Sequence, residues 1–183
     1  MTFKKNLIIA AICAGITLGI GSNAYGKNVQ GKSDNKAKAE AVKKENIKID
    51  KLENFLEEAD KYFYSSIINN KEGDFEKCVS MLNAKIKELD EKDKTSEYRF
   101  IVRYQLADYY SVKGFRAGDG GETEKMVGFY EKAATIAAEV VYIEPTDKYS
   151  MDIITESLDK IGEYDKDKKK LLKKQVESII LGF

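Results

Sequence analysis

Apolar side chains recur every three or four positions through most of the chain after residue 46. In the segment 51–69, for example, they fall at Leu52, Leu56, Ala59, Phe63 and Ile67. This spacing places them on one face of an α-helix, and the strict alternation of a half-buried strand is not sustained over any long stretch. The pattern therefore predicts an all-α fold.

Five further segments share this periodicity and are bounded by residues that commonly start or end helices. They cover about 74–89, 95–114, 123–143, 146–162 and 165–181. We expect Gly114 and Gly162 to end the third and fifth helices, and Pro145 to break the chain between the fourth and fifth. Residues 46–183 are therefore predicted to form about six amphipathic helices in three antiparallel hairpins, packed as a regular stack or an irregular bundle.

The same pattern predicts which side chains are buried in the last two helices. Gly128, inside the segment 123–143, costs helix stability relative to alanine, and a tight helix crossing there would explain its presence. The expected apolar stripes are Met151, Ile154, Leu158 and Ile161 in one helix, and Leu171, Leu172, Val176, Ile179 and Ile180 in the other. The lysines at the centre of 165–181 are expected to face solvent.

The segment before residue 46 has a different character. Lys4 and Lys5 precede an uncharged apolar run from Leu7 to Ile20, and small residues follow at Ala24 and Gly26. This order is typical of a Sec-type signal peptide over 1–26, and its apolar run is shorter than the ~20 residues of a membrane-spanning helix. We expect cleavage, an extracytoplasmic location (periplasmic, cell-surface or secreted) and no stable membrane insertion afterwards. An uncleaved anchor is the alternative. Residues 27–45 lack large apolar groups and are expected to be a flexible Lys-rich tether.

Charge argues against nucleic acid as a partner. Removing residues 1–26 takes away two lysines and leaves 29 basic residues against 31 acidic ones. The segment 27–45 contains six of the 29 basic residues, all lysines, and three of the 31 acidic ones. The domain 46–183 therefore has 23 basic residues against 28 acidic ones. A mildly acidic domain lacks the clustered positive charge that binds phosphate backbones.

Cys78 would be the only cysteine left after cleavage of the signal peptide. It lies on an apolar helix face beside Val79 and Leu82, which predicts a buried, inert thiol. An exposed Cys78 would instead link two copies of the chain. The oligomeric state is left open.

Little in the sequence indicates catalysis. The chain has no histidine, which removes histidine bases, catalytic triads and imidazole metal sites. The segment from Gly114 to Glu122 lacks the endings of a phosphate-binding or calcium-binding loop and is expected to be a mobile turn. We therefore predict a protein that is not an enzyme and holds no cofactor.

A cluster of arginine and tyrosine is the best candidate for a contact surface. Arg99 and Arg103 lie one helical turn apart beside several tyrosines, in a chain that otherwise uses lysine. Both residue types are enriched at binding hot spots. The alternative is a salt-bridged packing seam covered by tyrosines.

Several short motifs repeat along the chain. Gly73-Asp74-Phe75 and Gly162-Glu163-Tyr164 share a glycine–acid–aromatic order, and Gly114-Phe115 is related. Leu106, Ala107, Tyr110 and Gly114, followed by Ala133 and Pro145, have the spacing of a tetratricopeptide repeat. Residues 46–183 therefore resemble the tetratricopeptide-like class of helical hairpin repeats. Two features depart from that class, since Arg103 replaces a large aromatic residue and the turn after Gly114 is long.

The resemblance implies a curved surface whose concave side binds an extended peptide or a partner helix. It places Tyr104, Asp108 and Ser111 on that side. The predicted partner-binding residues are thus Arg99, Arg103, Tyr104, Asp108 and Ser111. Three functions remain open: an exported protein- or peptide-interaction module of the cell envelope or periplasm, a self-associating surface or structural protein, and a small cell-envelope hydrolase.

Overall fold

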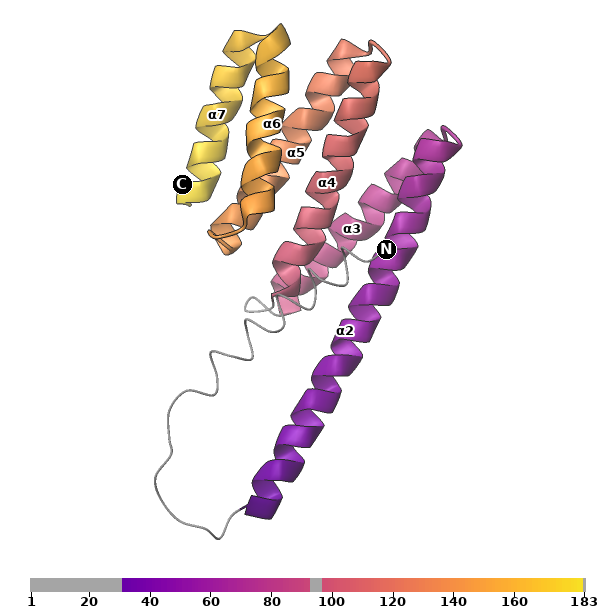
Figure 1. Cartoon of the computed structure of the whole chain (residues 1–183), viewed down its shortest axis with the longest axis vertical. Helices are drawn as coiled ribbons and strands as arrows, with labels where there is room; N and C mark the ends of the chain where they lie inside the picture. The colour runs from indigo at the N-terminus through magenta and orange to yellow at the C-terminus, as the bar shows by residue number, and fades with distance from the viewer. Residues whose placement is uncertain (1–30, 93–96, 183) are drawn as a thin grey trace. The chain divides into compact units, whose positions relative to one another are not determined.

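The computed structural model describes residues 31–92 and 97–182, with side chains from Ile49 onward. That part of the chain contains six helices and no strand, which confirms the all-α prediction there (Figure 1). The helices are α2 (Gly31–Ile68), α3 (Glu72–Lys92), α4 (Tyr98–Asp119), α5 (Thr123–Ile143), α6 (Lys148–Tyr164) and α7 (Lys166–Leu181). The predicted signal peptide, 1–26, lies outside the described residues.

The chain divides into two compact units, residues 1–58 and residues 59–183. In the first unit, α2 already begins at Gly31, so residues 31–45 are helical where the sequence favoured a flexible tether. Those residues lack large apolar side chains but are rich in Ala, Lys and Glu, which have high intrinsic helix propensity. Whether this segment acts as a spacer stays a prediction.

In the second unit, α5 is the central helix and contacts α4, α6 and α7, while α3 contacts α4. Small side chains allow these close contacts, because Ala133, Ala134, Ala137 and Ala138 on α5 are all fully buried. The end of α2 belongs to the same unit, where the ring of Phe63 stacks on that of Tyr109 with centroids 3.9 Å apart. Cys78 is buried at 0% exposure, as predicted for an inert thiol.

The helix boundaries differ from the predicted ones where glycine was expected to end a helix. α4 continues past Gly114 to Asp119, and α6 continues past Gly162 to Tyr164. A Cβ at Gly114 would meet ring atoms of Tyr130 at 3.1 Å, so this glycine provides space for a buried tyrosine of α5. The predicted mobile turn 115–121 is therefore mostly the last part of α4.

Other boundary predictions are confirmed. α5 covers 123–143, and α6 and α7 begin after the capping residues Asp147 and Asp165. The side chain of Asp147 accepts a hydrogen bond from the backbone N–H of Ser150, and that of Asp165 accepts one from Lys168. These contacts satisfy backbone donors that a helix leaves free in its first turn.

Three packing predictions are wrong. A Cβ at Gly128 would meet nothing within 4 Å, so no helix passes close to it. Met151 and Leu171 are exposed, whereas α6 buries Ser150 and Ser157 completely. Because serine is small, it allows α6 to approach its neighbours closely, and the buried face of α6 is rotated relative to the one that apolar residues alone indicate. Among the lysines of α7, Lys170, Lys173 and Lys174 are exposed as predicted, whereas Lys168 and Lys169 are half-buried and pair with Glu131 and Asp159.

Within the described residues, no helix combines the length and the apolar character needed to cross a bilayer.

Candidate interaction surface

Arg99 and Arg103 lie on α4 in a network of ion pairs, here called the arginine cluster, with Asp90 of α3 and Glu139 of α5. Arg99 Nε donates to Asp90 Oδ1 at 2.8 Å, and Arg103 Nε donates to Glu139 Oε2 at 2.9 Å. The other guanidinium nitrogens of Arg103 donate to both carboxylate oxygens of Asp90. With 8% of its side chain exposed, Arg103 connects three helices and leaves little surface for a partner.

The charges of this cluster stabilise one another. Burial opposes the charged form of Asp90, but hydrogen bonds from Arg103 and Arg99 outweigh that effect and lower its pKa. Burial also opposes the charge on Arg103, and its bonds to Asp90 and Glu139 outweigh burial and raise its pKa. Mutual pKa shifts of this kind belong to a structural ion-pair network, which is the packing alternative considered for these two arginines.

Tyr104 and Asp108 lie one turn apart on a different side of α4, facing α6. The ring of Tyr104 meets that of Tyr149 on α6 edge-to-face, with centroids 6.2 Å apart. Partial burial, with the nearby carboxylates of Asp108 and Asp147 and the hydroxyl of Tyr149, raises the pKa of Tyr104 to about 12. We call Tyr104, Asp108, Asp147 and Tyr149 the tyrosine face. It combines aromatic surface, two phenol hydroxyls and two carboxylates.

The five predicted site residues are therefore split between two places. Arg99 and Arg103 are in the arginine cluster, and Tyr104 and Asp108 are on the tyrosine face. Ser111 is buried on α4. Tyr149 and Asp147 were not predicted, because their proximity to Tyr104 arises from the contact between α4 and α6, and the only sequence signal was the tyrosine itself.

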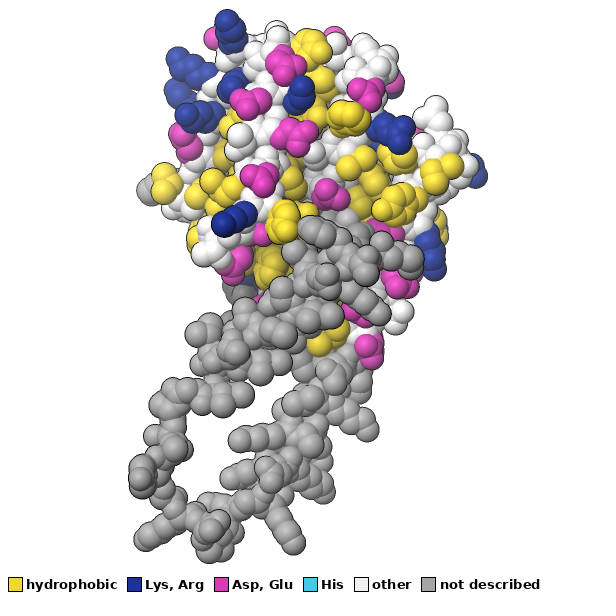
Figure 2. All heavy atoms as spheres, viewed as in Figure 1, with side chains coloured by type: hydrophobic (Ala, Val, Ile, Leu, Met, Phe, Trp, Pro, Cys, Tyr) yellow, Lys and Arg dark blue, Asp and Glu magenta, His cyan; other side chains and the backbone are white. Residues whose placement is uncertain are grey.

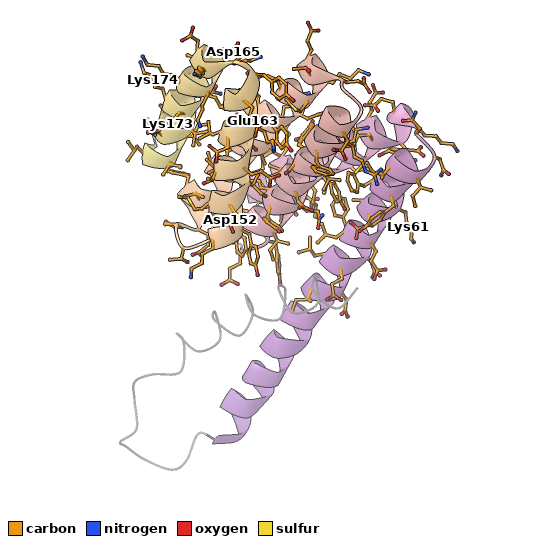
Figure 3. All side chains as sticks on the ribbon, turned by 45° about the horizontal axis from the view of Figure 1, so that its top comes forward. Lys61, Asp152, Glu163, Asp165, Lys173 and Lys174 are labelled. Carbon is orange, nitrogen blue, oxygen red and sulfur yellow. The ribbon has the colours of Figure 1, made fainter. Side chains whose placement is uncertain are left out.

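Charge is unevenly distributed over α6 and α7. Acidic side chains follow α6 at Asp152, Glu156, Asp159 and Glu163, and lysines dominate α7 (Figure 2). Figure 3 shows Glu163 near the α6–α7 turn and Asp152 toward the other end of α6, with Lys173 and Lys174 on α7. Lys169 pairs with Asp159 at 2.9 Å, and Lys160 with Glu163 at 3.1 Å. Asp152 and Glu156 have no ion pair with any described residue.

These groups are suited to recognition. Tyrosine rings beside carboxylates can bind basic or amphipathic segments through hydrogen bonds, ion pairs and cation–π contacts. In the described ranges, no group of three or more Cys, Asp or Glu side chains is arranged to hold a metal ion.

No protein-family model matches the chain, and neither a curated protein nor a solved structure is significantly similar to it. The resemblance to tetratricopeptide-like repeats therefore stays a prediction that depends on the sequence motifs.

Proposed function

We propose that the chain is an exported, non-enzymatic interaction module that binds a protein or peptide segment through the tyrosine face. The observation that carries this proposal is the Tyr104–Tyr149 pair, which joins α4 and α6 and leaves Tyr149 42% exposed. Tyrosine presents a large, rigid and amphipathic surface, which is why it is frequent at binding hot spots.

The electrostatic surroundings indicate the chemistry of the partner. Asp108 and Asp147 act on Tyr104, and further along α6 the carboxylates of Asp152 and Glu156 lack ion pairs among the described residues. A segment with lysine or arginine side chains complements this surface. The proposed partner is therefore a basic peptide or a basic protein segment.

Helical hairpins are part of the proposal. Consecutive helices from α3 to α7 contact one another. Across the turn between α2 and α3, the rings of Phe63 and Phe75 are in contact, with centroids 6.3 Å apart. In a tetratricopeptide-like arrangement, α4 and α6 would be the first helices of successive hairpins. Such helices line the concave side of a repeat stack, which agrees with the tyrosine face being shared by these two.

Binding selections with the purified chain test the proposal. We expect a displayed random peptide library to yield basic peptides whose affinity falls at least about tenfold in Tyr104→Ala/Tyr149→Ala, because hot-spot tyrosines commonly contribute that much. The melting temperature should change little. Tyr142→Ala is the control, since Tyr142 is also exposed but lies at the end of α5. Equal affinity of all three proteins for the selected peptides would refute the proposed face.

Self-association is a second candidate, favoured by exposed apolar side chains near the carboxyl terminus. Tyr142 and Leu181 are 59% and 67% exposed, and Gly182 lies against the ring of Tyr142, so the two side chains belong to one region. Multi-angle light scattering separates the candidates. A dimer that Leu181→Lys converts to a monomer would favour self-association, and a monomer at high concentration would favour the interaction module.

A further inference from the structure

A pocket of about 170 Å³ lies where the last turns of α4 and α6 meet the first part of α5. We call it the end pocket, and its lining includes Phe115, Asp119, Tyr130, Lys160, Glu163 and Tyr164. Its volume is several times the ~30 Å³ that one water molecule takes in the liquid, and it is below the ~300 Å³ of sites for drug-sized ligands. The end of one side chain fits it better than a whole small molecule does.

Tyr130 lines this pocket, and its hydroxyl has no hydrogen-bond partner among the described residues. The residue is 1% exposed. Burial, followed by the carboxylates of Glu156, Asp119 and Glu163, raises its pKa to about 12. Asp119 and Glu163 also line the pocket, so its walls combine two carboxylates with this tyrosine.

The charges around the pocket favour a cation. Asp119 has no ion pair with any described residue, while Glu163 pairs with Lys160 at 3.1 Å. The final turns of α4 and α6 direct carbonyl groups with partial negative charge toward this end of the molecule. The first turn of α5 has the opposite polarity, but it carries Glu124. An anionic ligand would be repelled by these acids.

The rim adds aromatic surface. Phe115 is 53% exposed and Tyr164 57% exposed, although both side chains are large and apolar over most of their surface. Planar guanidinium groups stack on aromatic rings and donate several hydrogen bonds in fixed directions, which an ammonium group does not. The combination of rim, acids and hydroxyl thus matches arginine better than lysine.

We propose that the end pocket receives the guanidinium group of an arginine side chain from the partner. The guanidinium group would donate hydrogen bonds to Tyr130 Oη and to the carboxylates of Asp119 and Glu163, with its plane against Phe115 or Tyr164. This inference rests on the proposed function, since it names the side chain by which a basic segment is recognised. It also identifies a site separate from the tyrosine face.

Methionine NMR can test the pocket with small probes. Met126 lines it, whereas Met81 on α3 and Met151 on α6 do not. We expect N-acetyl-argininamide to shift the ¹³C-methyl signal of Met126 and to leave those of Met81 and Met151 unchanged. N-acetyl-citrullinamide has nearly the same shape without the charge and should bind at least about fivefold more weakly. Equal shifts with both probes would overturn the proposal, and tighter binding of N-acetyl-lysinamide would overturn the choice of arginine.

Four variants separate recognition from folding. Tyr130→Phe removes a hydroxyl that has no partner, so it should weaken arginine binding without lowering the melting temperature. Asp119→Asn should weaken binding as well, and Glu76→Gln, which removes an exposed carboxylate of α3, is its control. Lys160→Met removes the cation that competes for Glu163 and should strengthen binding. Weaker binding of N-acetyl-argininamide to Lys160→Met would show that the probe does not compete with Lys160 for Glu163, and would refute the proposal.

The pocket and the proposed function can fail separately. If selected basic peptides bind through the tyrosine face but Tyr130→Phe and Asp119→Asn bind them normally, the pocket assignment fails and the function stands. If N-acetyl-argininamide shifts Met126 but no peptide binds, the pocket is a small-cation site and the proposed function fails.

Discussion

Two glycines inside helices of the second unit have opposite surroundings. A Cβ at Gly128 would meet nothing within 4 Å, whereas a Cβ at Gly114 would meet three ring atoms of Tyr130 at 3.1–3.2 Å. Gly128→Ala should therefore stabilise the protein by about 1 kcal/mol, the difference in helix propensity. Gly114→Ala should destabilise it by about 1 kcal/mol or more, because Tyr130 is buried and overpacking exceeds the gain in propensity.

Urea denaturation of both variants provides the measurement, and each variant is the control for the other. Both replace glycine by alanine in the interior of a helix, so propensity acts equally on them. A destabilised Gly128→Ala would show that this position is packed after all, and a stabilised Gly114→Ala would show that Tyr130 can move.

At the level of single residues, a role can be derived from the sequence where it depends on neighbours in the chain. Asp147 and Asp165 cap helices because the donors that they satisfy lie three residues further on. Burial of Ser157 and exposure of Met151 were not predicted, since hydrophobicity ranks them the other way. Which side of α6 is buried depends on how closely α6 can approach other helices, and that follows from side-chain size rather than polarity.

Helices α3, α4 and α5 are joined by the ion pairs of the arginine cluster. We expect Asp90→Asn to lower the free energy of unfolding by about 2 kcal/mol at neutral pH, since it removes charge-assisted hydrogen bonds to a buried arginine. The folded state lowers the pKa of Asp90 below its usual 3.8, so this contribution is present above about pH 4. It is lost as the pH falls further and Asp90 becomes protonated.

Urea titrations of wild type and Asp90→Asn between pH 7 and pH 2.5 measure that difference in stability, which should decrease on the acid side. Glu91→Gln is the matched control, because Glu91 is the next residue and its only ion pair with a described residue, to Lys87, is 4.0 Å long and exposed. Its effect should stay below about 0.5 kcal/mol. A pH-independent difference for Asp90→Asn would mean that the network contributes through packing alone.

For the described part of the chain, the existence and number of helices were predictable, and some of their limits were not. The three-to-four-residue period defines α3, α5, α6 and α7, whose buried residues recur at that spacing, whereas α4 is buried on most of its surface. Glycine misled the prediction at Gly114 and Gly162, where helices continue. A glycine that admits a neighbouring side chain looks the same in a sequence as one that ends a helix, and only the position of Tyr130 distinguishes them.

The candidate site is a property of the whole second unit, and for that reason only part of it could be predicted. Tyr104 and Asp108 were predicted as site residues because the resemblance to tetratricopeptide-like repeats assigns them to the concave side. Tyr149 is 45 positions away from Tyr104, and the end pocket combines residues from three helices. The contact between α4 and α6 determines both the tyrosine face and the end pocket, and no local pattern in the sequence encodes that contact.

The acidic face of α6 should make binding of basic peptides depend on salt. Raising the ionic strength from about 0.01 M to about 0.15 M shortens the screening length from ~30 Å to ~8 Å, so affinity should fall several-fold, mainly through a slower association rate. Asp152→Asn/Glu156→Gln should reduce this dependence, since both carboxylates lack ion pairs among the described residues. Glu76→Gln/Glu91→Gln makes the same change in net charge on α3 and should retain it. Surface plasmon resonance at both salt concentrations measures the peptide affinity of the two double variants. Equal salt dependence in both would mean that net charge, rather than the face of α6, attracts the peptide.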